Sequence, residues 1–238
     1  MQKTLSPGQI EAFYHDEFVE DQARDFVLMM KRYKELSQVV DVGGGCGFFA
    51  RRLNQEPPYK VKVMDMDPTS VAACHAAGIQ ADIGDALAPK FSGNEQVASF
   101  NLILHHLIAT TETGTLALQS KALTSWRGHA QLIFVNEYIY QSYLANLSGW
   151  LIFQITKNSV LSWLGKQVAR VIPSFKANTF GVGVRFRSNS EWKAIFDHAG
   201  FSVVAETIGK SERVALPLRL LLIQTIRRDS FLLAAKAP

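Results

Sequence analysis

The sequence predicts an α/β protein with a doubly wound, seven-stranded and mostly parallel sheet. Three observations lead to this prediction. Five short apolar runs, typical of buried strands, alternate with segments long enough to form helices. A glycine-rich stretch, VDVGGGCG, overlaps the end of the first run. A helix pattern and two further strand-like runs close the chain and would complete the sheet.

The first 36 residues are expected to form a helical cap. The stretch SPGQ has the features of a helix start, because Ser6 can cap the helix, Pro7 suits the first helical position and Gln9 can close a capping box. A second helix is predicted over 22–34, where apolar side chains recur at helical spacing.

The parallel strands are predicted from the apolar runs. In chain order these runs are 38–42, 60–64, 79–83, 99–104 and 131–135. Later, the stretch NSEWKAIFDHAGF predicts a helix closed by Gly200. Two more strands are then expected, over 201–208 and 230–236.

Residues 138–184 do not fit this alternation and are expected to form a helical insertion. The stretch LSWLGKQVARVI is amphipathic, with Leu161 and Leu164 on one face and Lys166 and Arg170 on the other. The preceding SGWLIFQI is apolar nearly all round. The insertion is predicted as a lid over a substrate pocket, and two alternatives stay open: ordinary core, and a contact with a membrane surface.

Composition and charge narrow the class of protein. The 238 residues are 47% hydrophobic and 19% charged, with a formal net charge of +4, which fits a single globular domain over 1–238. The basic residues are scattered, so a nucleic-acid partner is not expected. Cys46 and Cys74 match neither a metal site nor a disulfide framework. Without a signal-peptide pattern or a long apolar run, we expect a cytoplasmic protein with no bound metal.

The four glycines between 43 and 47 require an explanation, because glycine is poor in strands and helices. In doubly wound folds the turn after the first strand brings nucleotide-like ligands close to the backbone and to a helix N-terminus. A dinucleotide fingerprint would need glycine where Phe48 stands, and the lysine of a P-loop is missing. The turn therefore suits a nucleoside-like ligand that lacks a pyrophosphate.

Residues after the next two strands extend this site. Asp65 comes about 20 residues after the first glycine, where a carboxylate can accept both ribose hydroxyls. Met66 is placed to pack on the face of an adenine ring. In ADIGDALAP, Asp85 is placed to accept from the adenine amino group, with Ala86 beside the ring. Together these residues predict adenosine without phosphates.

The stretch VVDVGGGCG resembles the D/E-x-G-x-G-x-G motif of the class I S-adenosylmethionine-dependent methyltransferases. In register with that motif are Asp41, Gly43, Gly45 and Gly47. SFNLILHH resembles the fourth motif of this family, and HAGFSVV the approach to its antiparallel hairpin. The resemblance covers 37–238 and departs at Asn101, where the family usually has aspartate.

The resemblance implies a Rossmann-like methyltransferase fold and S-adenosyl-L-methionine as the cofactor. It also implies that Asp65 and Asp85 are the acids that bind the ribose and the adenine. Asp41 would orient the turn and the cofactor's ammonium.

Catalytic candidates follow the fourth and fifth strands, because ligands bind at the carboxyl ends of strands in this fold. His105 is assigned as the general base, since imidazole titrates near neutral pH. Glu137 would either orient this histidine or bind a polar group of the substrate. The substrate-binding candidates are Tyr14, His106, Tyr138 and Arg185.

The predicted function is methyl transfer to a small, partly aromatic or lipophilic metabolite, with oxygen as the favoured acceptor, by in-line displacement. The aromatic residues of 138–184 suggest an enclosed apolar pocket. The sequence LHHLI replaces the N/D-P-P-Y/F motif of enzymes that methylate exocyclic amines of bases or glutamine. Three alternatives stay open: N- or C-methylation of a small molecule, a protein or RNA methyltransferase, and a cofactor-binding scaffold that has lost transfer.

Overall fold

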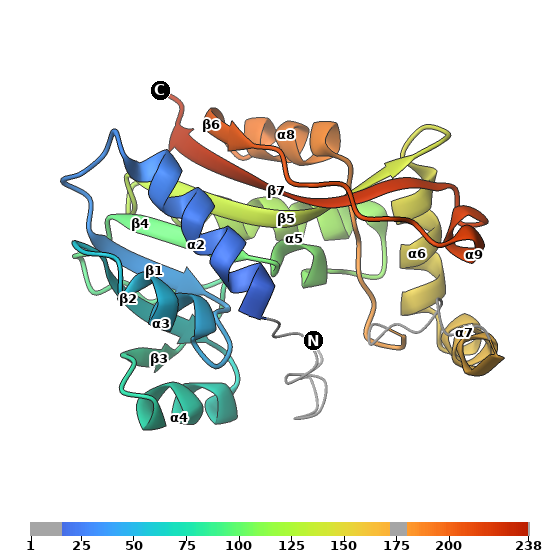
Figure 1. Ribbon diagram of the computed structural model, residues 1–238, viewed down its shortest axis with the longest axis horizontal. Helices are drawn as coiled ribbons and strands as arrows, with labels where there is room; N and C mark the ends of the chain where they lie inside the picture. Colours follow the sequence, from blue (N-terminus) through green and yellow to red (C-terminus); the bar gives the residue numbers. More distant parts are fainter. Residues whose placement is uncertain (1–15, 172–179, 238) are drawn as a thin grey trace.

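The computed structural model describes residues 16–171 and 180–237 (Figure 1). Within them, seven strands form one sheet in the order β3-β2-β1-β4-β5-β7-β6. The strands are β1 (Gln38–Val42), β2 (Lys60–Asp65), β3 (Ala81–Ile83), β4 (Val97–Asn101), β5 (Leu132–Ser142), β6 (Phe201–Thr207) and β7 (Ile223–Ala235). Strands β1 to β5 are parallel, and β7 runs antiparallel between β5 and β6. The predicted doubly wound sheet is confirmed.

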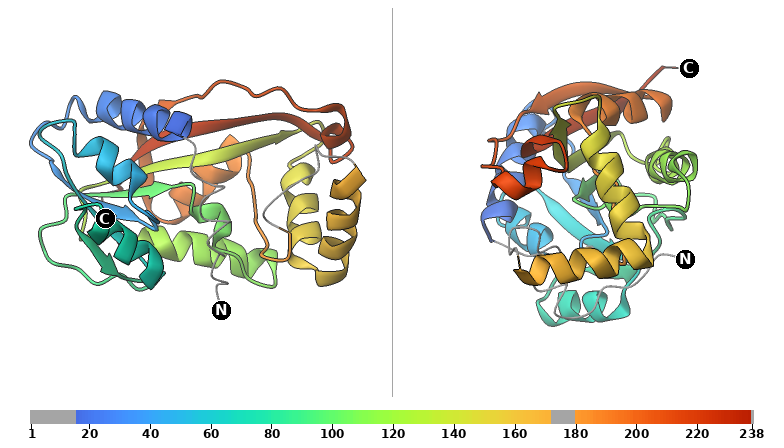
Figure 2. Two further views of the ribbon diagram at one scale, coloured as in Figure 1. Left: turned by 60° about the horizontal axis from the view of Figure 1, so that its bottom comes forward. Right: turned by 90° about the vertical axis from the view of Figure 1, so that its right-hand side faces the viewer.

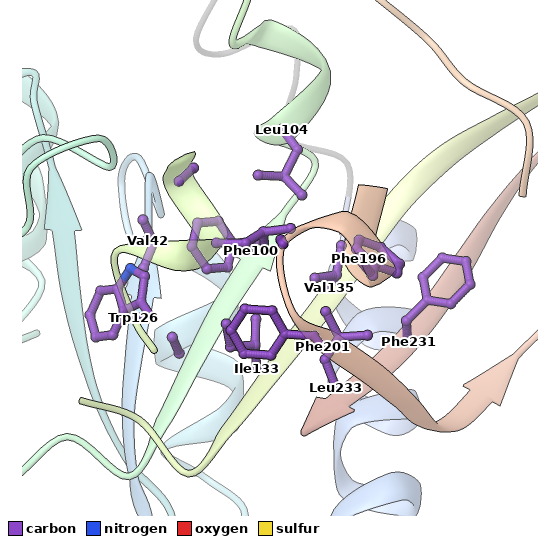
Figure 3. Packing of buried hydrophobic residues seen from close by; sticks show 14 of the residues in the cluster. Val42, Phe100, Leu104, Trp126, Ile133, Val135, Phe196, Phe201, Phe231 and Leu233 are labelled. Carbon is purple, nitrogen blue, oxygen red and sulfur yellow. The ribbon is translucent and has the colours of Figure 1, made fainter. Parts of the chain in front are cut away.

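Helices cover both faces of the sheet, because successive strand residues point to opposite sides. They are α2 (Asp16–Met30), α3 (Phe48–Leu53), α4 (Pro68–Ala76), α5 (Glu112–Thr124), α6 (Leu147–Lys157), α7 (Ser159–Val171), α8 (Asn189–His198) and α9 (Leu216–Arg219), with a 3₁₀ helix, η1 (Leu104–His106). One core lies under α5 and α8 and contains Phe100, Ile133 and Phe196 (Figure 3). The other lies under α2, α3 and α4 and contains Phe26 and Phe134.

Helix boundaries follow local capping chemistry. At the start of α8, the Ser188 side chain accepts from the Glu191 N–H and the Glu191 carboxylate accepts from the Ser188 N–H, which is a capping box. The helix is followed by Gly200, whose φ of +84° needs glycine. The predicted end of this helix is therefore confirmed. The predicted N-terminal helix start at 6–9 lies outside the described residues.

Some boundaries differ from the prediction. Strand β4 begins at Val97 and ends at Asn101, because Leu102 has a φ of +54° and the chain then turns into η1. Residues 138–142 belong to β5 rather than to the insertion, since β5 pairs with β7 along its whole length. The helices that follow Ser142 are α6 and α7.

Strands β5 and β7 extend well beyond β1 and β4, and together they form an arm (Figures 1 and 2). Helices α6, α7 and α9 lie at the far end of this arm, away from β3 and α4 (Figure 1). The arm carries the chain continuously from the carboxyl edge of the parallel strands to these helices.

A buried polar network holds α2 on the sheet. Gln22 donates from Nε2 to Asn136 Oδ1 at 3.1 Å, and Asn136 Nδ2 donates to Ser230 Oγ at 2.9 Å. Ser230 then donates to Asp25 Oδ2 at 2.9 Å. All four side chains are buried. Because buried polar groups are costly when unpaired, this network fixes the position of α2.

Candidate active site

The glycine turn between β1 and α3 needs a left-handed backbone at three positions. Gly43, Gly45 and Gly47 have φ values of +68°, +54° and +76°. A Cβ at Gly43 would overlap the Ile103 side chain. One at Gly47 would lie 2.9 Å from the sulfur of Cys74. Only glycine therefore fits at Gly43 and Gly47, because neighbouring side chains already occupy the space that a Cβ would need.

Asp65, the last residue of β2, is joined to this turn. Its Oδ2 accepts from the Gly45 N–H at 2.9 Å, and its Oδ1 accepts from the Asp67 N–H at 2.8 Å. The side chain is half-buried. Each carboxylate oxygen has a second lone pair, so the group can still accept hydrogen bonds from a ligand at the turn.

Asp41, near the end of β1, is almost completely buried beneath the turn. Its Oδ1 accepts from Asn101 Nδ2 at 3.0 Å. Its Oδ2 and the Oδ1 of Asn101 have no hydrogen-bond partner among the described residues. Burial raises the pKa of Asp41 to about 7; the Asn101 hydrogen bond lowers it and the charge of Asp65 raises it.

The asparagine at position 101, where the resembling family usually has aspartate, is explained by its contact with Asp41. Its amide donates to both Asp41 and Ser99, at 3.0 and 2.8 Å. An aspartate at 101 would instead set a second carboxylate against a buried one, which repels unless one is protonated. The departure from the family pattern is thus matched to the buried Asp41.

The adenine-binding candidates follow β2 and β3. Met66 is exposed, and Ala86 is buried. Asp85 is exposed, and its Oδ1 accepts from the Leu87 N–H at 2.8 Å, which forms a turn. This backbone contact explains why an aspartate suits position 85 without reference to any ligand.

His105, in η1 after β4, meets Glu137, in the middle of β5. Glu137 is fully buried, and its Oε2 lies 2.7 Å from His105 Nδ1. Its Oε1 accepts from the Leu104 N–H at 2.6 Å and so anchors η1. Glu137 is therefore a positioning residue for the histidine. His105 itself is only 2% exposed.

Aromatic rings surround this histidine. The Phe186 ring stacks on His105 at a centroid distance of 4.9 Å and on Tyr140 at 4.3 Å. Tyr138 meets Phe186 edge-on at 5.8 Å. Burial raises the pKa of both tyrosines. Burial, and then the neighbouring His105, place the pKa of His106 well below its usual range.

Solved structures match this architecture, whereas no family model and no curated protein matches the sequence. The chain matches magnesium protoporphyrin IX methyltransferase (ChlM) from Synechocystis PCC 6803 with bound SAH, at a TM-score of 0.57 and 12% identity, over 99% of this chain and 90% of that one. NcsB1 is an O-methyltransferase from neocarzinostatin biosynthesis, solved in complex with SAH and 1,4-dihydroxy-2-naphthoic acid. It matches at a TM-score of 0.51 and 16% identity, over 85% of this chain and 50% of NcsB1. A variant of LepI in complex with SAH and a substrate analogue matches at 0.52 and 15%, over 84% of this chain and 43% of LepI, so this chain spans less than half the length of LepI.

The chain has the class I methyltransferase fold. In this fold the strand order reverses between β1 and β4, and the glycine turn lies at that switch point. Asp41 and Asp65 stand beside the turn, and His105 follows β4 on the same edge of the sheet. The methyltransferase fold therefore gathers the residues that the sequence grouped by motif.

The expectations for Arg185 are corrected. Its guanidinium is buried and makes ion pairs at 2.9 Å with both Glu112 and Glu191. It also donates to the Phe186 carbonyl oxygen. It is neither solvent-exposed nor open to an acidic substrate, because a desolvated guanidinium needs these carboxylates. Only its backbone bears on the site, where the Arg185 N–H donates to the His105 carbonyl at 2.9 Å.

Two further substrate-binding candidates are Tyr14 and Tyr138. Tyr14 is outside the described residues. Tyr138 is half-buried, and the guanidinium of Arg228 lies between its ring and that of Phe18, 5.9 and 3.7 Å from the two centroids. Phe18 belongs to α2, so this contact joins the N-terminal helix to the His105 region. Among the residues described, no cluster of three or more His, Cys, Asp and Glu could hold a metal ion.

Proposed function

We propose that this protein uses S-adenosyl-L-methionine to methylate a small, partly aromatic or lipophilic metabolite at oxygen. The observation that carries the proposal is the hydrogen bond from Gly45 to Asp65, because it holds a ribose-binding carboxylate against the glycine turn at the switch point of the sheet. The likeness to structures that contain SAH supports the same cofactor.

The residues present fit this cofactor. A nucleoside would lie against the left-handed backbone of Gly43–Gly47, and Asp65 would accept from its ribose. Asp41 Oδ2 and Asn101 Oδ1 are buried acceptors without a partner in the described chain, and an ammonium group is a donor that would satisfy them. When bound, the cofactor supplies a methyl group made electrophilic by a sulfonium.

His105 is suited to take the proton of a substrate hydroxyl. A neutral imidazole that donates from Nδ1 to Glu137 carries its lone pair on Nε2. Glu137 is itself fixed by the Leu104 N–H, so the ring keeps one tautomer and one orientation. His106 is more exposed than His105 and is the ring that a substrate meets first.

The aromatic surroundings favour the substrate class. Rings of Tyr138, Tyr140 and Phe186 lie within 6 Å of one another or of His105. Where the half-buried rings of Tyr138 and Tyr140 reach the site, they would favour flat apolar molecules through stacking and the hydrophobic effect.

Calorimetry with S-adenosylmethionine and S-adenosylhomocysteine tests the cofactor. We expect the wild-type protein to bind both compounds. Asp65→Ala should lower the affinity about 100-fold, which is the scale of two charge-assisted hydrogen bonds. Asp82→Ala on β3 is the matched control, because that exposed carboxylate pairs only with Lys62 among the contacts of the described chain. If the wild-type protein binds neither compound, the proposed function is wrong.

Transfer from methyl-labelled cofactor to a panel of hydroxylated aromatic compounds tests the base. His105→Gln should lower kcat about 10²- to 10⁴-fold with cofactor affinity unchanged. Glu137→Gln should shift the pH profile of kcat, because it changes the charge beside the imidazole. A larger loss of kcat in His106→Gln than in His105→Gln would assign the proton transfer to His106 instead.

A further inference from the structure

Apolar side chains are concentrated at the far end of the β5–β7 arm. Figure 2 (right) looks onto this end, where α9, α6 and α7 lie in front. Exposed side chains there include Trp150 on α6, Val160, Trp163 and Leu164 on α7, Leu216 on α9 and Leu220 just after it. We call the exposed surface of α6, α7 and α9 the end face. Scattered apolar side chains are normal on a protein surface, but a cluster from three helices marks an interaction site.

Helix α7 is turned so that its polar side faces inward. Ser162 is 2% exposed; its Oγ donates to the Ile155 carbonyl at 2.8 Å and accepts from the Gly181 N–H at 3.0 Å. Gly165 packs closely against the Phe180 ring. Val160, by contrast, is 65% exposed. The amphipathic helix therefore uses its small and polar side to pack against the protein and presents its apolar stripe outward.

The end face is also cationic. The sequence contains no aspartate or glutamate from 138 to 190. Lys166 and Arg170 are exposed on α7, and Arg219 is exposed on α9. Between 208 and 228 the sequence has a single acidic residue, Glu212, and its carboxylate lies 3.7 Å from Arg228. Positive charge beside exposed apolar surface is the pattern of helices that lie in a membrane interface.

We propose that the end face docks on the surface of an anionic lipid bilayer. Helix α7 would lie in the plane of the bilayer, with Val160, Trp163 and Leu164 among the acyl-chain boundary and Lys166 and Arg170 at the lipid phosphates. A second copy of the chain fits less well, because a two-fold interface would set this cationic surface against itself. In the described ranges, no helix is long and apolar enough to cross a membrane.

Vesicle flotation with the full chain tests this docking and does not depend on methyl transfer. Wild-type protein should float with vesicles that contain phosphatidylglycerol and should bind pure phosphatidylcholine vesicles at least about tenfold less. Binding should fall as salt is raised, because the phosphates are screened. Tryptophan emission should shift to shorter wavelength when Trp163 leaves water.

Matched variants locate the surface. The double variant Val160→Glu/Leu164→Glu should lose at least about tenfold in vesicle binding, since both side chains would leave the lipid. Leu28→Glu on α2 is the control, because Leu28 is also exposed, at 50%, and lies away from α6, α7 and α9. The double variant Lys166→Ala/Arg170→Ala keeps the apolar stripe and should weaken only the salt-dependent part of vesicle binding. Circular dichroism checks that each variant is folded.

Three results would overturn the proposal. The first is wild-type protein that stays unbound with both vesicle types at low salt. The second is a double variant that binds vesicles as the wild type does. The third is sedimentation that shows a wild-type dimer, made monomeric by Val160→Glu/Leu164→Glu, without any vesicle binding; it would assign the end face to self-association.

Discussion

Replacing Asp41 with asparagine should stabilise the cofactor-free protein above neutral pH. Burial, the largest cause, raises the pKa of this carboxyl from 3.8 to about 7. Between these two values the folded state keeps a proton that the unfolded chain has released. The stability that this proton contributes is complete below a pH of about 4 and is lost as the pH rises through about 7.

The size of the effect follows from the two pKa values. One pKa unit corresponds to ~1.4 kcal/mol, so the rise from 3.8 to about 7 makes the ionised carboxylate cost on the order of 4 kcal/mol above pH 8. Asparagine carries no charge to desolvate. Its amide oxygen can still accept from Asn101 Nδ2, as Asp41 Oδ1 does in the wild type. Allowing for imperfect pairing of the new amide, we expect a gain of about 1–3 kcal/mol at pH 8.

Urea unfolding of both proteins at pH values of about 5 and 8 measures this effect. From the lower to the higher pH, the free energy of unfolding of the wild type minus that of Asp41→Asn should fall by on the order of 3 kcal/mol. At the higher pH the Tm of the variant should be raised by about 2–4 °C for each kcal/mol. Parallel pH dependences of the two proteins would refute the reasoning. The same variant should bind S-adenosylmethionine more weakly, because the proposed acceptor for its ammonium loses its charge.

Four further substitutions, one of them a control, test other parts of the structure by urea denaturation. Both Gly47 and Gly78 have φ above +70°, but only a Cβ at Gly47 would meet Cys74. Gly47→Ala should therefore lower the free energy of unfolding by about 2–3 kcal/mol and Gly78→Ala by only about 1 kcal/mol; equal losses would contradict this. Asn136→Ala should lower the free energy of unfolding by about 1–3 kcal/mol and speed hydrogen exchange in α2, because it breaks the polar network. Unchanged exchange in α2 would show that this network does not hold the helix. Arg187→Met should cost about 1–3 kcal/mol, because the buried Gln119 loses its donor while Glu112 and Glu191 keep Arg185, and an unchanged midpoint would show that the contacts of Arg187 add nothing.

Features set by neighbouring residues could be predicted from the sequence. The bounds of β1 agree with the prediction, since a short apolar run defines a buried strand. The glycine turn was predicted because a left-handed backbone at Gly43 and Gly47 admits few other residues. The end of α8 at Gly200 follows the same rule. Asp65 was placed correctly at the end of β2 because a strand end is a local property.

Other predictions failed or were incomplete where the contacts join distant parts of the chain. The length of β5 depends on its pairing with β7, which lies almost a hundred residues later. Arg185 was expected to bind substrate, yet its guanidinium pairs with Glu112 on α5. Asn101 looked like a departure from a motif until its amide was seen to pair with Asp41.

The sequence by itself determined the fold class, the glycine turn and the positions of its acidic residues, because periodicity and backbone sterics act over a few residues. Only the tertiary structure decided that Glu137 fixes His105, that Arg185 is already paired and that α7 turns its apolar side outward. Burial and electrostatic pairing depend on which segments meet in space. One stretch of amphipathic helix is compatible with core, lid or surface until its neighbours are known.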